Sequence, residues 1–370
     1  MNEEKFIKRH LNFAQRIVNR LDLSLKGLTV LTECASGAYA YTPIVAALCG
    51  AQVIAFGKDT RHGSFENNKK NILEIASHID PALKNNIILV NSKNDIELSE
   101  IDICTNSGML RPLDKIFIEK LKPTCVIPLM WGTWEFRGSD LDITACQQRQ
   151  IAVIGTNEYF KSTDFTIIEA LLGLKILFDM NIAVGSCKVV LIGGKIPADQ
   201  IADLYERMGI DFVWFSPTGK ERKKNCYPYS ELKKIKKLND IDAFVCAEHT
   251  DSFLIAGKNG GISFKEIAAT HSLASWGHIV GNIDVEELKQ SGLSYYPETI
   301  LPFGYQTYGT EHLGYEPVIQ LNTCGLKVGE LSAKARLSGK TIEEAIKQTT
   351  DYGIGQDFEG GFLQYRPQKS

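Results

Sequence analysis

A histidine at the end of a predicted strand is the side chain in this sequence best suited to acid–base chemistry. His278 closes the segment SLASWGH at 272–278. An imidazole titrates near neutral pH, which is what proton transfer under physiological conditions requires. Gly277, just before it, carries no side chain that would block an approaching substrate. We therefore predict that His278 is a catalytic acid–base group. The alternative is a histidine that is hydrogen-bonded at the strand end.

A second catalytic candidate lies where a long helix is predicted to begin. Lys161 and Asp164 belong to the segment NEYFKSTDF. A lysine whose ammonium group is desolvated can act as a base, so we predict a catalytic role for this pair. The alternative is structural, because Ser162, Thr163 or Asp164 can cap the N-terminus of the helix.

Two loops carry groups that could bind an acidic substrate. Arg137 and Asp140 lie in WEFRGSD, where an arginine fork could hold a carboxylate through two parallel hydrogen bonds. A surface salt bridge is the alternative for this pair. Thr32 and Ser36 lie in the hydroxyl-rich segment 32–42, which leads into a helix whose first N–H groups could hold an anion. Simple helix capping is the alternative there.

The turn after the apolar strand at 187–194 has the glycines that a dinucleotide-binding unit needs. Aligned on Gly193, the residue after Gly194 is Lys195, which takes the second glycine position of the G-x-G-x-x-G pattern, and Ala198 takes the third. Alanine is tolerated at the third position. The Cβ of Lys195 crowds a pyrophosphate, whereas its charge could neutralise a phosphate. We predict that these four residues bind the cofactor, and the alternative is a βα turn with no ligand.

The end of the next strand bears on which cofactor is bound. An acidic residue there would accept the ribose hydroxyls of NAD. Here the strand ends at Ser216, and Lys220 follows with further basic residues. A small hydroxyl group and nearby basic residues suit a ribose 2′-phosphate. We predict NADP or NAD as the cofactor, with NADP favoured. The basic segment 220–237 also has interleaved apolar residues, which favours a solvated helix face.

The elements that position these residues alternate along the chain. Short apolar runs alternate with helical patterns, which predicts parallel strands joined by right-handed crossovers. A mostly apolar helix at 165–181 directly precedes a βαβ run at 187–216. The chain is also too long for one ordinary core. The sequence therefore predicts an α/β protein with two domains.

This order of elements resembles the two-domain superfamily of D-2-hydroxyacid dehydrogenases and S-adenosylhomocysteine hydrolase. Three stretches carry the resemblance: the segment 132–157, the apolar helix leading into the glycine turn, and GHIVGNIDVEEL at 277–288. The last is similar to the hydrolase segment G-H-F-D-x-E-I-D-V-x-x-L. The resemblance implies two Rossmann-like or flavodoxin-like domains with parallel sheets, in which the cofactor domain is inserted into the outer domain.

The resemblance also implies domain boundaries and site positions. It assigns 1–165 and 300–370 to an outer substrate domain, 184–295 to the Rossmann-like domain, and 165–183 to a bridging helix. It places His278 beside the cofactor ring. It supports the lysine and aspartate candidates too, because the hydrolases have a similar K-S-x-F-D stretch, although the order of Asp and Phe is transposed here.

Two departures limit which chemistry the resemblance implies. The strand at 272–278 lacks the arginine that the dehydrogenases carry near the nicotinamide, and Cys324 stands near the place of their Pro-His pair. We expect an NAD(P)-dependent oxidoreductase that acts on a small polar metabolite held between the domains. The alternatives are a hydrolase-like enzyme that uses bound NAD transiently, and a non-catalytic binding or assembly module that retains the fold.

The composition indicates which classes of binding partner to expect. The net charge of -3 gives no reason to expect nucleic acid or membrane binding. The nine scattered cysteines form no C-x-x-C pair, so no metal site is expected. The charged N-terminal segment does not resemble a secretory signal. We expect a cytoplasmic homodimer with a small-molecule substrate.

Overall fold

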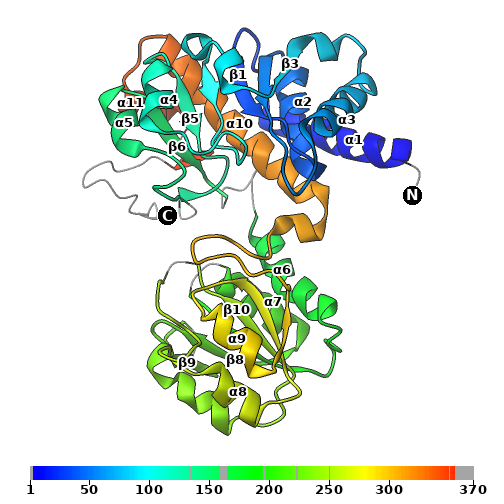
Figure 1. The fold of residues 1–370 in the computed structure, drawn as a ribbon, viewed down its shortest axis with the longest axis vertical. Coiled ribbons are helices and arrows are strands. Elements are labelled where there is room, and N and C mark those ends of the chain that lie inside the picture. Colours follow the sequence, from blue (N-terminus) through cyan, green and yellow to red (C-terminus); the bar gives the residue numbers. More distant parts are fainter. Residues whose placement is uncertain are drawn as a thin grey trace. The chain divides into compact units, whose positions relative to one another are not determined.

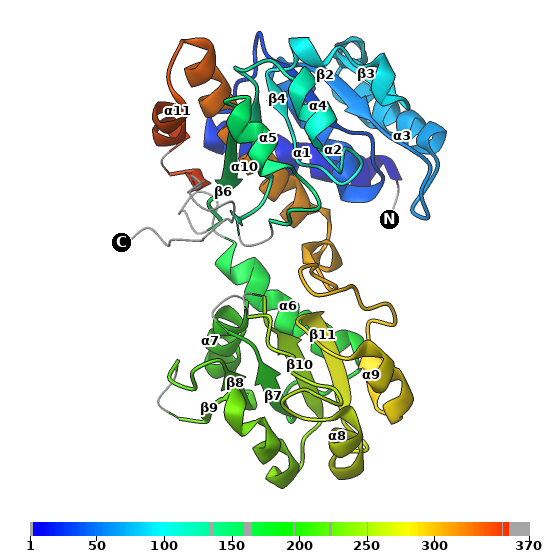
Figure 2. The same cartoon turned by 60° about the vertical axis from the view of Figure 1, so that its left-hand side comes forward.

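The computed structural model describes residues 3–133, 136–158, 165–194, 197–221, 224–249, 251–349 and 351–354. The chain divides into two compact units. Unit 1 comprises Met1–Asp164 and Gly314–Ser370, and unit 2 comprises Phe165–Leu313. Each unit is built on a sheet flanked by helices (Figures 1 and 2). The predicted α/β class, with one domain inserted into the other, is confirmed.

Unit 1 contains a seven-stranded sheet in the order β13-β6-β5-β4-β1-β2-β3. Six of these strands are parallel, and β13 pairs antiparallel with β6 at one edge. The strands are β1 (Thr29–Glu33), β2 (Gln52–Phe56), β3 (Ile87–Val90), β4 (Ile103–Cys104), β5 (Val126–Pro128), β6 (Ala152–Thr156) and β13 (Gly353–Ile354).

Helices cover both faces of the unit 1 sheet. Apolar residues of α1, α2, α3 and α10 form the core on one face, and those of α4 and α5 pack on the other. The helix α1 buries residues spaced three or four apart, as expected of an amphipathic helix. The helices are α1 (Glu3–Leu21), α2 (Tyr41–Leu48), α3 (Phe65–Ser77), α4 (Lys115–Lys120), α5 (Ile143–Gln148), α10 (Tyr315–Leu337) and α11 (Ile342–Thr349).

The long helix α10 contains Cys324, which stands near the place of the Pro-His pair of the dehydrogenases. Cys324 lies in the middle of α10 and is fully buried. Burial raises the pKa of its thiol, so the group is a protonated core residue. A Cβ at Gly325 would lie 2.8 Å from the Met130 Cα, which shows how closely α10 packs against the chain that follows β5.

Unit 2 contains a six-stranded parallel sheet in the order β12-β11-β10-β7-β8-β9. Counted within each unit, the six parallel strands of both sheets follow the order 3-2-1-4-5-6 of a doubly wound fold. The strands are β7 (Lys188–Ile192), β8 (Asp211–Ser216), β9 (Cys226–Pro228), β10 (Ala243–Ala247), β11 (Ser275–Val280) and β12 (Ser294–Tyr296).

Helices again cover both faces of this sheet. Residues of α6 and α7 form one core, and residues of η6, α8 and α9 form the other. The predicted bridging helix is α6, which packs against α7 and β11 within unit 2. The helices are α6 (Thr166–Asp179), α7 (Ala198–Met208), η6 (Tyr229–Lys237), α8 (Phe264–Thr270), α9 (Val285–Ser291) and η7 (Thr310–Leu313).

In the basic segment 220–237, the structure shows the solvated helix face that the sequence favours, in the form of a 3₁₀ helix. The segment contains the short strand β9 and the 3₁₀ helix η6. Tyr229, Leu232 and Ile235 are buried under this helix, while lysines face outward. Their spacing of three residues matches one turn of a 3₁₀ helix, and this places the apolar residues on one side.

Among the described residues, no helix has both the length and the apolar character that a membrane span needs. Within the same residues, no group of three or more His, Cys, Asp or Glu side chains is arranged to hold a metal ion.

Candidate functional site

Each sheet has one place where its strand order reverses. In an open α/β sheet, the loops on either side of this switch point diverge, and ligands bind in the crevice at the carboxyl ends of the strands. In unit 2 the switch point lies between β7 and β10, and in unit 1 it lies between β1 and β4. Of the candidate residues, Ser36 lies on the loop that follows β1, and Gly193 and Gly194 lie on the loop that follows β7.

The glycine turn of unit 2 follows β7 and leads into α7. A Cβ at Gly193 would lie 2.2 Å from the backbone oxygen of Ala247 and 2.7 Å from the Ala198 Cβ. The indole Nε1 of Trp214 also donates a hydrogen bond to the Gly193 carbonyl oxygen, at 2.9 Å. Gly193 and Ala198 therefore let α7 pack closely on the sheet, as the first and third fingerprint positions do. Lys195 lies outside the described residues.

A buried carboxylate lies against Gly194, the residue between the first and second fingerprint positions. A Cβ at Gly194 would be 2.9 Å from Oε2 of Glu248, which directly follows β10 and is fully buried. The Tyr229 hydroxyl donates a hydrogen bond to Glu248, and the Asp251 N–H donates another at 2.8 Å. Sequence reasoning missed Glu248, although an acidic residue directly after a buried strand is a usable signal.

The end of β8 brings Ser216 together with an acidic residue. The Ser216 hydroxyl donates to the Glu221 carboxylate and accepts from the Gly219 N–H at 2.8 Å, and Thr218 donates to Glu221 at 2.8 Å. Burial alone would raise the pKa of Glu221, but hydrogen bonds from Ser216 and Thr218 hold it below its usual value. Lys220 is exposed beside this ionised group.

His278 lies inside unit 2. Its strand continues to Val280, so His278 is not the last strand residue, and its ring is fully buried. Neither ring nitrogen has a hydrogen-bond partner among the described residues. Burial lowers the pKa of His278 to about 3, which keeps the ring neutral. A Cβ at Gly277 would meet Met180 and Ile176 at 3.0 and 3.1 Å, so this glycine makes room for α6 rather than for a substrate.

The end of β1 in unit 1 carries a buried carboxyl group that sequence reasoning missed. Glu33 is only 7% exposed, and its Oε2 accepts a hydrogen bond from the Met109 N–H at 3.2 Å. Burial raises the pKa of Glu33, although the Met109 hydrogen bond and the positive charge of Arg111 act in the opposite direction. A carboxyl group shifted in this way can exchange protons nearer neutral pH.

Buried hydroxyl groups line the same end of the sheet. The Thr105 hydroxyl, just after β4, donates to Thr32 at 3.0 Å and lies 2.8 Å from the Ser107 hydroxyl. Thr32 is thus part of a hydroxyl row at the switch point. Ser36 is half-buried, and its side chain does not cap η1 (Gly37–Ala40). The capping alternative for this serine is therefore not what the structure shows.

The predicted pair of Arg137 and Asp140 forms, and a second arginine joins it. Asp140 Oδ2 accepts from Arg137 Nε at 2.9 Å and lies 3.1 Å from Arg111 Nη1. Arg111 also donates to the side chain and backbone oxygens of Asn106, and its guanidinium lies 4.4 Å from the centre of the Trp131 ring. Both arginine side chains are only 15% exposed, so this is not a surface salt bridge.

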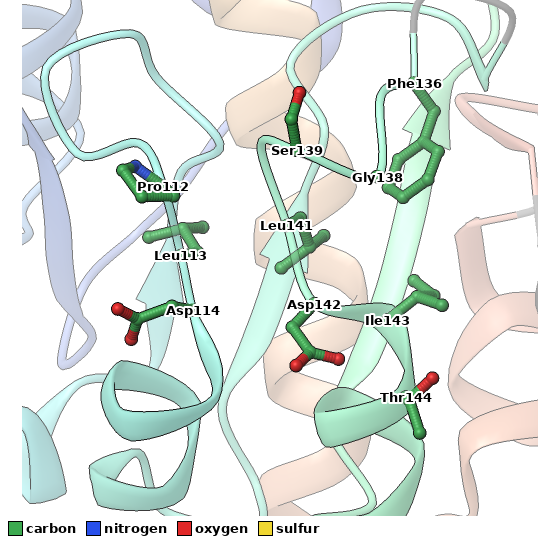
Figure 3. Close-up of a pocket in the computed structure, with 10 residues that line it drawn as sticks. All are labelled: Pro112, Leu113, Asp114, Phe136, Gly138, Ser139, Leu141, Asp142, Ile143 and Thr144. Carbon is green, nitrogen blue, oxygen red and sulfur yellow. The ribbon is translucent and has the colours of Figure 1, made fainter.

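A cavity of about 380 Å³ opens next to these loops (Figure 3). It is lined by residues 112–114, 136, 138–139 and 141–144, and Leu113 and Leu141 form a short β-bridge there. Asp114 and Asp142 contribute carboxylates to it, but both accept N–H groups at the starts of α4 and α5. Because neither Glu33 nor Arg111 lines this cavity, we place the candidate site at the switch point instead.

Lys161 and Asp164 lie outside the described residues, so their catalytic role stays a prediction.

The close packing at Gly193 predicts a large effect of a single methyl group. Gly193→Ala should lower the free energy of unfolding by about 1–3 kcal/mol, because the backbone of β10 must move to admit the new Cβ. Gly185→Ala is the matched control, since nothing lies within 4 Å of its Cβ position, and its effect should be within about 0.5 kcal/mol. Denaturant unfolding measures both. Equal stability of the two variants would contradict this account of the turn.

The comparisons with known proteins agree with this fold. No protein-family model and no curated protein sequence matches the chain. A dipicolinate synthase chain from Bacillus halodurans is similar in structure, with a TM-score of 0.51 and 10% identity over 80% of this chain and 96% of that one.

Two dehydrogenases are also similar in structure. A D-2-hydroxyisocaproate dehydrogenase has a TM-score of 0.44 and 13% identity over 85% of this chain and 98% of that one. A D-isomer-specific 2-hydroxyacid dehydrogenase family protein from Klebsiella pneumoniae 342 has a TM-score of 0.42 and 13% identity. The match covers 86% of this chain and 96% of that one. The likeness to the dipicolinate synthase chain shows a shared two-domain α/β fold, and the resemblance seen in the sequence is confirmed at this level.

Proposed function

We propose that this chain is an NAD(P)-dependent oxidoreductase, similar to the 2-hydroxyacid dehydrogenases, that acts on a small polar metabolite. The observation that supports this most is the glycine turn of unit 2 at the switch point between β7 and β10. This is where doubly wound folds of the same strand order bind dinucleotides. When bound, the nicotinamide ring would supply the group that gives or takes a hydride.

Two features of unit 2 support a dinucleotide site. Gly193 and Ala198 bring the start of α7 close to the end of β7, and N–H groups at a helix start favour a diphosphate. The Glu221 carboxylate at the end of β8 is an acceptor of the kind that ribose hydroxyls need. One feature opposes binding, namely the Glu248 carboxylate beside Gly194.

Unit 1 contains groups suited to a polar substrate. The Glu33 carboxyl group would exchange a proton with a substrate hydroxyl or carbonyl oxygen, since its raised pKa brings both protonation states within reach. Arg111 and Arg137, which share Asp140, would orient an anionic substrate group. These are the roles that we propose at the carboxyl edge of the unit 1 sheet.

The role of His278 stays a prediction, and its burial is the observation against it. A group that exchanges protons with a substrate must be reached by that substrate, whereas this ring has no exposed surface. The same burial favours the alternative of a non-catalytic module that retains the fold, because that alternative does not need an acid–base histidine.

A two-step experiment tests the proposed function. A thermal-shift screen of metabolites, run with NAD and with NADP, should find a hydroxy or oxo acid that stabilises the protein. The absorbance of the reduced nicotinamide should then change when that compound and the cofactor are mixed with the protein. Copurified NAD in a native mass spectrum, with no net change in absorbance, would favour the hydrolase-like alternative. No affinity for any dinucleotide would favour the binding module.

The choice between NAD and NADP depends on the end of β8. The predicted preference for NADP rests on Ser216 and Lys220, whereas the ionised Glu221 should repel a 2′-phosphate. Glu221→Gln should therefore raise the affinity for NADP relative to NAD by roughly tenfold, and Lys220→Glu should lower it. Calorimetric titration with both cofactors measures the ratio. An unchanged ratio in both variants would show that this loop does not contact the ribose.

A further inference from the structure

Glu248 is a buried ionisable residue at the position where a diphosphate would have to approach. It follows β10 directly, on the opposite side of the switch point from the glycine turn. Its backbone N–H donates to the Val280 oxygen at 3.0 Å, and it pairs with Pro197, at the start of α7, in an isolated antiparallel bridge. The loop after β10 is therefore hydrogen-bonded to β11 and paired with the residue at the start of α7.

The carboxylate of Glu248 lies directly on the turn. Both of its oxygens lie within 3.3 Å of the position that a Cβ would take at Gly194. In a G-x-G-x-x-G turn, the second glycine position lets the backbone approach the pyrophosphate, and Gly194 directly precedes that position. Here the open space beside Gly194 is taken up by a carboxylate, so the turn already has an anionic group from the protein itself.

Among the described residues, at least two donors keep the carboxylate in this position. The Asp251 N–H binds Oε1 at 2.8 Å, and the Tyr229 hydroxyl binds Oε2. Burial, together with Glu248 itself, raises the pKa of Tyr229, so the hydroxyl keeps its proton and remains a donor. The Tyr229 ring is in turn stacked on Phe253, with 5.4 Å between the ring centres. These contacts hold the side chain toward the turn.

We propose that Glu248 competes with the diphosphate of the dinucleotide for the glycine turn, so that its carboxylate weakens cofactor binding and must turn away before the cofactor is seated. Tyr229 is the positioning residue that holds this carboxylate in place. The inference rests on the proposed function, because it concerns the same cofactor. Like charges that are brought together in a low-dielectric site repel strongly, and the fully buried Glu248 cannot be screened by solvent.

Calorimetric titration of the full chain with NAD tests this inference. Glu248→Gln keeps one acceptor oxygen, for the Asp251 N–H, and its amide N–H can donate to the Tyr229 hydroxyl oxygen in place of the second bond. It removes the charge, and it should bind NAD about tenfold more tightly than the unmodified protein. Tyr229→Phe should give a smaller gain in affinity, because it only releases the carboxylate. Adenosine, which has no phosphate, should bind both variants and the unmodified protein equally.

The loop provides a matched control. Asp251→Asn removes a charge three residues away, from a carboxylate that accepts the Phe253 N–H, and retains the N–H that binds Glu248. It should leave the affinity for NAD unchanged. Circular dichroism and denaturant unfolding establish that each variant is folded.

The outcomes separate this inference from the proposed function. If the unmodified protein binds NAD and Glu248→Gln binds it equally well or more weakly, the competition is overturned and the oxidoreductase proposal stands. An equal gain in NAD affinity for Asp251→Asn would also overturn the competition, since it would show that removing any nearby negative charge has the same effect. If neither the unmodified protein nor Glu248→Gln binds a dinucleotide, both proposals are overturned.

Discussion

Glu33→Gln should lower the rate of the proposed oxidoreductase reaction by about 10²–10⁴-fold, the usual loss when an acid–base group is removed. The glutamine amide oxygen can still accept the Met109 N–H that now binds Oε2, so the fold should be retained. Steady-state kinetics with the substrate found in the screen measures the loss in kcat. A thermal unfolding curve shows whether unit 1 is intact.

The pH dependence gives this prediction a second readout. Oxidation of a hydroxyl group needs the ionised carboxylate, so the rate should rise with pH through the raised pKa of Glu33. Reduction of a carbonyl group needs the protonated form, so its rate should fall over the same range. Glu33→Gln should abolish the pH dependence of both rates, because an amide does not titrate over this pH range.

His278→Asn is the informative comparison in the same assay. If the ring stays enclosed as the structure has it, this variant should keep most of its activity. A loss of about 10²–10⁴-fold for His278→Asn together with full activity of Glu33→Gln would reverse the assignment. It would also restore the histidine that the sequence favours as the acid–base group.

Asp140→Asn should cost about 3 kcal/mol of stability, the second large effect that we expect. Removing one partner of a buried ion pair leaves the other charge poorly compensated, which typically costs about 3–5 kcal/mol. Asp140 is the shared acceptor of Arg111 and Arg137, and all three side chains are at least 85% buried. Denaturant unfolding followed by circular dichroism measures the change.

An exposed ion pair of unit 1 provides the control. Lys115 and Glu119 lie 3.8 Å apart on α4, and more than half of each side chain is exposed. Glu119→Gln should change stability by less than about 0.5 kcal/mol. If Asp140→Asn is no more damaging than Glu119→Gln, the arginine cluster is not an organised part of the site.

The strands of both units could be predicted because alternating apolar runs are a local signal. The segment DFVWFS predicts a strand and is β8 in full. The same local signal does not show where a strand ends. The run at 272–278 predicts a strand that stops at His278, but pairing with β10 carries β11 from Ser275 to Val280. Two further residues are enough to change an edge position into a buried one.

The candidate site was predictable only in part, for a related reason. Arg137 and Asp140 are three residues apart, so their pairing could be read from the sequence. Glu33, Asn106 and Arg111 come together because β1 and β4 are neighbours in the sheet, which is a long-range pairing. The sequence did contain one signal for the loop that carries Asn106 and Arg111, namely a run of polar residues directly after a buried strand.

A crystal structure of the full chain grown with saturating NAD, and a second with NADP, tests the central claim most directly. The account predicts a dinucleotide whose diphosphate lies at the turn from Gly193 to Ala198, with the Glu248 side chain turned away from Gly194. A turn that holds no ligand at saturating cofactor, with Glu248 still against Gly194, would contradict it. A dinucleotide bound elsewhere on the protein would contradict it equally.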